Sequence, residues 1–142
     1  MKTYGGFYVS RIQKLSGRVF EKLLKKNKVD AFNGAQGRIL YVLWEHEKLS
    51  FSDVGKYTSL AKTTLTSMID RMEENGLVER IPDKKDRRQI YVSITEKARK
   101  YQQKFNKVSG EMNAIFYKGF STDEIEHLDK MLEKILNNLE VA

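Results

Sequence analysis

A change of hydrophobic period just after Gly76 constrains the fold of this chain more than any other feature. Up to that glycine, apolar residues recur every three or four positions, which is the spacing of amphipathic helices. From Leu77 to Ile81 and from Ile90 to Ile94, apolar and polar residues alternate, and this pattern predicts two β-strands joined by a loop. The helical spacing then returns. The sequence therefore predicts a mainly α fold interrupted by one hairpin.

Six helices are expected, four before the hairpin and two after it. Ser52 is expected to cap the third helix, and Thr58 or Ser59 the fourth, because Ala61 at its start has no side-chain oxygen. The first helix is expected to reach about Lys26, and the second is expected to begin at the N-cap Asn33. The third helix should reach about Tyr57, and the fourth should end at Asn75-Gly76. The fifth should run through Ala98 to Phe116, and the last should begin at the capping box of Ser121 and Glu124.

The first and last helices carry longer apolar stripes than one compact domain of 142 residues needs. Such stripes commonly pack against a second copy of the chain, so a symmetric homodimer is expected. The stripes consist of Tyr8, Ile12, Leu15, Val19 and Leu23 in the first helix, and of Ile125, Leu128, Leu132, Ile135 and Leu139, facing inward, in the last.

Charge and composition narrow the class of partner. The formal net charge is +7, which favours a polyanion such as nucleic acid or an anionic membrane. The absence of cysteine excludes disulfides and thiolate zinc sites and fits a cytoplasmic location. The longest apolar run, from Ile39 to Trp44, is too short to span a bilayer, and no signal peptide is expected.

The middle of the chain has the organisation of a winged helix-turn-helix, in which a short helix and a turn precede a helix with small polar residues on its outer side. Short hydroxyl side chains let such a helix approach the major groove of DNA closely. An uncharged solvent-exposed face is the alternative, but the cationic loop that follows favours a DNA backbone as the partner. The expected DNA contacts are Lys62, Thr63, Thr64, Thr66, Ser67 and Arg71 in the helix, with Asp70 also outward, and Lys84, Lys85, Asp86, Arg87 and Arg88 in the loop.

The run from Gln36 to Lys97 resembles the MarR (multiple-antibiotic-resistance regulator) family of bacterial transcription factors, most specifically in LTSMIDRMEENGLVERIPDKKDRRQIYVSITEK. The resemblance implies one MarR-type domain over residues 1–142, with a DNA-binding lobe at 33–95 and dimerisation helices at 1–32 and 96–142. It also implies a homodimer that binds a palindromic operator, commonly as a repressor. The family's wing motif falls on Asp86 and Arg88, so Arg88 is expected to enter the minor groove while Asp86 holds its guanidinium.

The resemblance further implies release from DNA by small aromatic or phenolic compounds. The family's effector pocket lies between the dimerisation helices and the DNA-binding lobe. By that location, the candidate effector-binding residues are Tyr8, Ile12, Arg18, Tyr41, Trp44 and Tyr101. Oxidation of a cysteine cannot be the signal in this chain, because it contains none.

Two other functions are alternatives to regulation of transcription. Enzymatic activity is not expected, because the chain has only two histidines and no nucleophile elbow or phosphate loop. Glu124 and His127 have a spacing that di-iron proteins use, but no second pair accompanies them, so no metal and no cofactor are expected. The second alternative is a basic protein that binds DNA without sequence preference or lies on a membrane surface; the first helix lacks the tryptophan that favours membranes.

Overall fold

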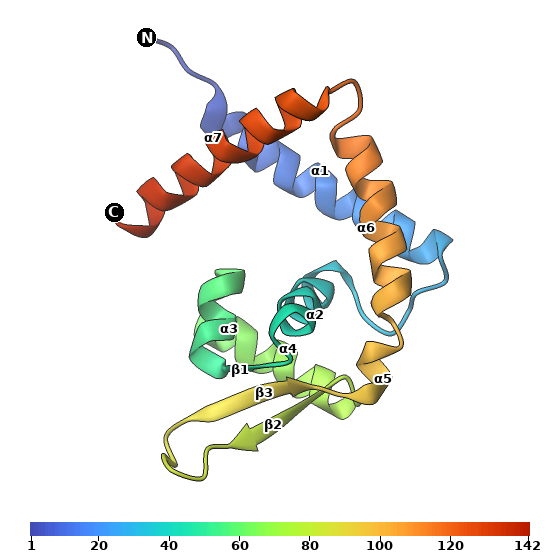
Figure 1. Cartoon of the computed structure of the whole chain (residues 1–142), viewed down its shortest axis with the longest axis vertical. Helices are drawn as coiled ribbons and strands as arrows, with labels where there is room; N and C mark the ends of the chain where they lie inside the picture. The colour runs from blue at the N-terminus through green and yellow to red at the C-terminus, as the bar shows by residue number, and fades with distance from the viewer.

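The computed structural model describes residues 1–142 and has two parts. Helices α1 and α7 lie at one end together with both termini, a lobe of three helices and a small sheet lies at the other, and α6 connects them (Figure 1). The mainly α winged helix-turn-helix architecture expected from the sequence is confirmed. The elements are α1 Gly5–Lys26, α2 Gly34–His46, β1 Lys48–Ser50, α3 Phe51–Thr58, α4 Lys62–Glu74, β2 Val78–Pro82, β3 Ile90–Ile94, α5 Glu96–Arg99, α6 Gln102–Phe116 and α7 Thr122–Glu140.

The predicted hairpin is present as β2 and β3, but the sheet has a third strand that the sequence analysis missed. The strands are antiparallel in the order β1-β3-β2, and Val92 of β3 pairs with Leu49 on one side and Arg80 on the other. Strand β1 is only three residues long, too short for an alternating pattern to identify it, so its pairing with β3 defines it. Glu47, with φ at 62°, turns the chain from α2 into this strand.

Several helix ends differ from the expected ones. Ser50, not Ser52, caps α3, because its hydroxyl accepts the N–H of Asp53 at 3.1 Å. Neither Thr58 nor Ser59 caps α4: the Thr58 hydroxyl instead donates to the Val54 carbonyl at 2.7 Å, and α4 begins without a side-chain cap. The helix expected after the hairpin is interrupted between α5 and α6. The N-cap at Asn33 and the capping box at Ser121 are confirmed, and Gln36 turns the Asn33 cap into a second capping box.

One hydrophobic core joins the lobe to the C-terminal end of α1 and to α6. Ile39, Leu40 and Leu43 of α2 are fully buried in it, because they form the inner side of a helix that packs against the sheet. Gly37 lies close to Phe105 of α6, and a Cβ at this position would be only 3.0 Å from that ring. This close approach of α2 and α6 holds the lobe against the connecting helix.

The outer end of the molecule has no such core within one chain. Helix α7 contains no buried residue, and large apolar side chains of α1 and α7 are exposed. Leu132, Ile135 and Leu139, expected to face inward, therefore have no cover from their own chain. Contiguous exposed apolar surface of this kind marks a protein–protein contact, which agrees with the expected homodimer.

The link between α4 and β2 depends on a glycine with a positive φ. Gly76 has φ at 74°, and the N–H groups of Gly76 and Leu77 donate to the carbonyls of Glu73 and Met72, which closes the helix in a Schellman motif. Because a Cβ in this conformation costs about 1–2 kcal/mol, Gly76→Ala should lower the free energy of unfolding by that amount in urea titrations. Gly110→Ala, inside α6 with nothing near its Cβ, is the control and should not lower it. Equal losses in the two variants would contradict this role of Gly76.

Candidate nucleic-acid interface

Helix α4 presents a polar side to solvent because its apolar side is anchored in the core. Leu65, Ile69 and Met72 are buried, and they orient the helix in the lobe. Thr66 donates its hydroxyl to the Lys62 carbonyl at 2.8 Å, and the hydroxyl oxygen can still accept a hydrogen bond. All six α4 residues predicted to contact DNA are exposed: Lys62, Thr63, Thr64, Thr66, Ser67 and Arg71.

The tip of the hairpin is a structured turn. The Asp86 side chain accepts the backbone N–H of Arg88 at 3.0 Å, and its carbonyl accepts the N–H of Gln89 at 3.0 Å. The same carboxylate oxygen lies 3.4 Å from Nε of Arg88, whose side chain is otherwise 93% exposed. Asp86 therefore shapes the turn and orients the guanidinium, as expected for an arginine that enters a narrow groove. Lys84, Lys85 and Arg87 are exposed beside it.

An ion-pair network that the sequence analysis missed joins the hairpin to α4. The guanidinium of Arg80, in β2, pairs with Glu73 at 2.8 Å and with Asp70, and the Arg80 backbone N–H donates to Glu73 at 3.0 Å. The N–H and the guanidinium of Arg80 hold the pKa of the Glu73 carboxyl below its ordinary value. Asp70 faces outward, as expected, but its carboxylate is engaged in this contact. The network fixes the hairpin relative to the helix.

Replacing Arg80 with alanine should weaken DNA binding by about tenfold, or ~1.4 kcal/mol, because the hairpin would lose its fixed position beside α4. A titration of labelled operator DNA measures this effect, and circular dichroism checks that the fold is kept. Arg99→Ala is a suitable control, since it breaks exposed ion pairs with Glu47 and Glu96 that lie on α2–β1 and α5 rather than on α4. Comparable losses of affinity in the two variants would mean that Arg80 has no special positioning role.

Helix α4 and the hairpin together form one concave surface. A groove of about 900 Å³ runs between α3, α4 and the hairpin, and its apolar lining residues are Phe51, Leu60, Leu65 and Ile90. Four of the residues predicted to contact DNA line this groove, although they are up to 26 positions apart in the chain: Lys62, Thr66, Asp86 and Arg88. The other predicted contacts lie on the exposed surface outside this groove: Thr63, Thr64, Ser67, Arg71, Lys84, Lys85 and Arg87.

The six candidate effector residues fall into two groups within one chain. Trp44 and Tyr41 pack on Phe105, with ring centroids 5.0 and 6.2 Å apart, and Tyr101 packs edge-on against Phe32. Tyr8, Ile12 and Arg18 instead lie exposed on α1, where Tyr8 neighbours other aromatic rings of the same helix. A second cavity of about 660 Å³, between α6 and α7, is lined by none of the six. Their effector-binding role stays a prediction.

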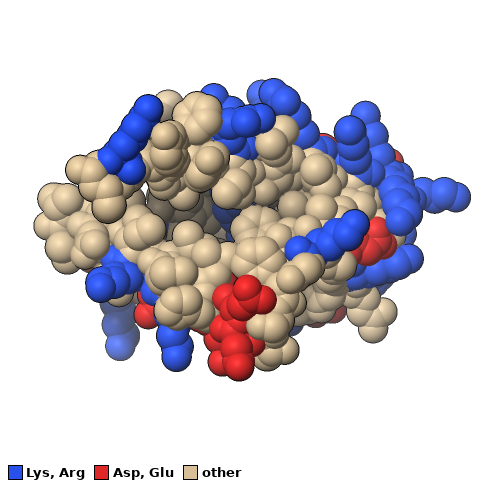
Figure 2. All heavy atoms as spheres, turned by 90° about the horizontal axis from the view of Figure 1, so that it is seen from above, with Lys and Arg blue, Asp and Glu red and all other residues tan.

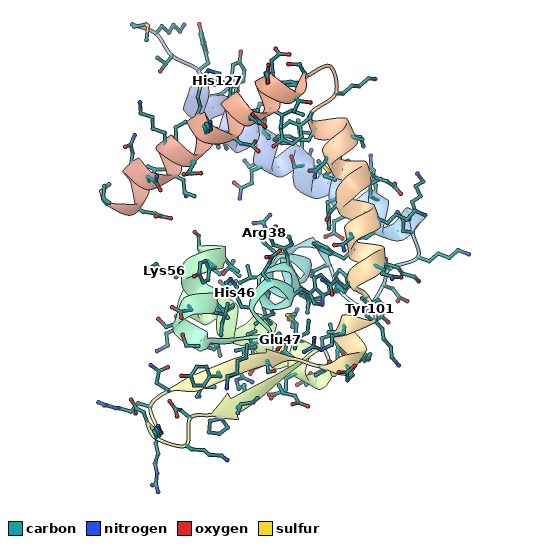
Figure 3. The ribbon with its side chains drawn as sticks, viewed as in Figure 1. Arg38, His46, Glu47, Lys56, Tyr101 and His127 are labelled. Atoms are coloured by element: carbon teal, nitrogen blue, oxygen red, sulfur yellow. The ribbon has the colours of Figure 1, made fainter.

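The two histidines lie in different parts of the molecule, His46 on α2 and His127 on α7 (Figure 3). His46 stacks on Tyr57, with ring centroids 5.3 Å apart. Glu124 of the E-x-x-H pair caps its own helix by accepting the Ser121 N–H at 2.9 Å. No group of three or more metal-binding side chains gathers in the structure. None of the helices has the length and apolar content needed to cross a membrane.

Comparison with known proteins decides the family. Residues 32–90 match the sequence profile of the MarR family. The organic hydroperoxide resistance transcriptional regulator of Bacillus subtilis is 31% identical over 100 residues, which cover 70% of this chain and 67% of that protein. This chain belongs to the MarR family.

Other MarR-related proteins agree over most of the length. The transcriptional repressor IacR of Pseudomonas putida is 29% identical over 134 residues, covering 94% of this chain and 78% of that protein. A mutant MarR of Escherichia coli, crystallised with operator DNA, has the same fold with a TM-score of 0.82 at 22% identity, over 96% of this chain and 99% of that one. The MarR fold therefore includes the helices α1 and α7 as well as the lobe.

Proposed function

We propose that this MarR-family protein is a homodimeric repressor of transcription that binds a palindromic operator and leaves it when a small aromatic or phenolic compound binds. The observation that carries the DNA-binding role is the concave surface in which α4 and a structured, cationic hairpin tip face the same groove. An exposed arginine held by Asp86 beside a polar helix suits a minor groove next to a major groove. The repressor role is supported by IacR, whose name describes a repressor.

Dimerisation matters because one lobe reads only half of a palindrome. The two copies of α4 in the dimer must lie about one helical turn of DNA apart, roughly 34–36 Å, to enter successive major grooves. The exposed apolar residues of α1 and α7 supply the surface through which two chains join. A ligand that stabilises another separation of the lobes would lower operator affinity by shifting the population of dimers.

The signal differs from cysteine oxidation. The related B. subtilis protein is named for resistance to organic hydroperoxides, but this chain has no cysteine that a peroxide could oxidise. Phe32 packs on Trp44, Tyr101 and Phe105, and this aromatic cluster lies where α2 meets α5 and α6, at the junction between the lobe and the connecting helix. A ligand with an aromatic ring that packs there would change this junction directly. The proposed role is regulatory, without catalysis, and its place is the cytoplasm.

Selection of bound duplexes from a random pool tests the proposal. The expected result is a palindromic consensus whose half-sites are centred one helical turn apart. Binding to the selected site should then survive an excess of random duplex. If the pool yields no consensus and random duplex abolishes binding, the protein is instead a basic protein that binds DNA without sequence preference.

A further inference from the structure

Most of the net positive charge lies outside the DNA-binding lobe. Residues 1–32 contain eight Lys or Arg and two Asp or Glu, a net charge of +6, whereas residues 33–95 contain ten and nine, a net charge of +1. Seen from the end that carries α1 and α7, Lys and Arg side chains crowd the right-hand side and few acidic side chains lie among them (Figure 2). Operator recognition by the lobe does not account for this distribution.

The cations of α1 form a single line, here called the α1 strip. Its residues follow one another at intervals of three or four, so they lie within about 80° of the helix circumference and extend over about 21 Å. Every one of them is exposed. The α1 strip consists of Arg11, Lys14, Arg18, Lys22 and Lys25.

No carboxylate of the same chain neutralises the α1 strip. The ion pair that α1 makes, between Lys26 and Glu111 at 3.3 Å, involves no residue of the strip. Glu21, the acidic residue of α1, instead accepts the backbone N–H of Gly34 at 2.6 Å. Like charges three or four residues apart destabilise a helix by about 0.2–0.5 kcal/mol per pair. The strip therefore costs folding free energy that its own chain does not offset, apart from Lys25, which lies favourably in the last turn.

Dimerisation does not explain the strip either. The apolar stripe of α1 lies beside it on the helix surface, and that stripe is what a partner chain would cover. Cations inside such an interface would lose hydration without compensation unless the partner chain supplied carboxylates, so we expect the interface to leave the strip in solvent. Helix α1 begins at the end of the molecule opposite the hairpin, and only its last turns reach the core shared with the lobe (Figure 1). A straight duplex held by α4 and the hairpin cannot also lie along it.

We propose that the α1 strip binds the phosphate backbone of a second segment of duplex DNA, so that one operator-bound dimer joins two segments. A regular line of unpaired cations matches a row of phosphates, and release of condensed counterions would drive this association without sequence preference. An anionic membrane is the less favoured partner, because the apolar stripe beside the strip is needed for dimerisation. The inference is independent of which operator the lobe reads.

The test uses the full-length dimer with its lobes occupied. Biotinylated operator duplex, selected as above, is immobilised and saturated with protein, and retention of a labelled random duplex is measured. The triple variant R11Q/K14Q/K22Q should retain at least tenfold less random duplex. A plot of log retention against log salt concentration should also become less steep by up to about five, because the variant dimer loses three cations from each chain. Its affinity for operator should change less than twofold, which also shows that the variant is folded. Gln is a good helix former, so α1 should persist.

A charge-matched control separates a local site from net charge. K118Q/K130Q/K134Q removes three cations from the loop before α7 and from α7 itself, and it should retain random duplex like the wild type. Equal losses in the two triple variants, or full retention by the strip variant, would overturn the proposal. The proposal would also be overturned if the strip variant lost binding to phosphatidylserine vesicles but still retained the random duplex, because the strip would then bind a membrane.

Discussion

Replacing Arg88 with alanine is expected to weaken operator binding by about 100-fold and to leave the dimer intact. The Arg88 side chain is 93% exposed and is oriented by Asp86, so its truncation removes a groove contact without disturbing the core. A groove-inserted arginine contributes about 1–3 kcal/mol, and a dimer loses two of them. Fluorescence anisotropy titration with labelled operator measures the affinity, and light scattering measures the dimer.

The neighbouring arginine provides a matched control. Arg87 lies in the same turn but is expected to contact phosphate, so Arg87→Ala should weaken binding much less and lower the log–log salt slope by about one per site. Asp86→Asn should fall between the two, because an amide still caps the turn but attracts the guanidinium less strongly. An Arg88→Ala variant with unchanged affinity, or one no worse than Arg87→Ala, would rule out the proposed insertion into the groove.

Placing a charge on the apolar stripe of α7 should abolish dimerisation. Ile135 is 50% exposed in the single chain, among other exposed apolar residues of this helix. In Ile135→Asp, a carboxylate would have to be buried without a partner when two chains associate, which costs several kcal/mol. Operator affinity should fall at least 100-fold, since a monomer reads one half-site. Light scattering at micromolar concentration should report a monomer.

Asn137→Asp adds the same charge on the opposite side of α7 and serves as the control. It should remain a dimer and bind operator with wild-type affinity. If Ile135→Asp also remained a dimer, α7 would not form the interface. If it became a monomer that still bound operator tightly, the lobe would not depend on a second copy.

The features that the sequence predicted well are those that neighbouring residues determine. The turn after α4 was recognised because Asn75-Gly76 combines a short polar residue with the residue that most readily adopts a positive φ. Strand β3 was located at its observed bounds because its alternation of apolar and polar residues is uninterrupted. The contact between Asp86 and Arg88 spans two positions in one turn, so the wing motif contained it.

The features that were missed depend on contacts between distant parts of the chain. Ser50 and Ser52 are equally good caps in isolation, and the pairing of Ser50 with Tyr91 decides between them by ending β1 where α3 begins. The position of Asp70 on α4 predicts that it faces outward, but it does not predict the ion pair with Arg80, ten residues later. No periodicity encodes either contact.

The sequence by itself determined the order of helices and hairpin, the polar side of α4, the charged tip of the hairpin and the excess of cations in α1. These properties follow from residue spacing and local turn chemistry. The tertiary structure alone decided the third strand, the Arg80 network that fixes the hairpin beside α4, and the position of α1 away from the hairpin. Each of these depends on which elements meet in space, and packing of the shared core around Leu40, Ile69 and Val92 determines that.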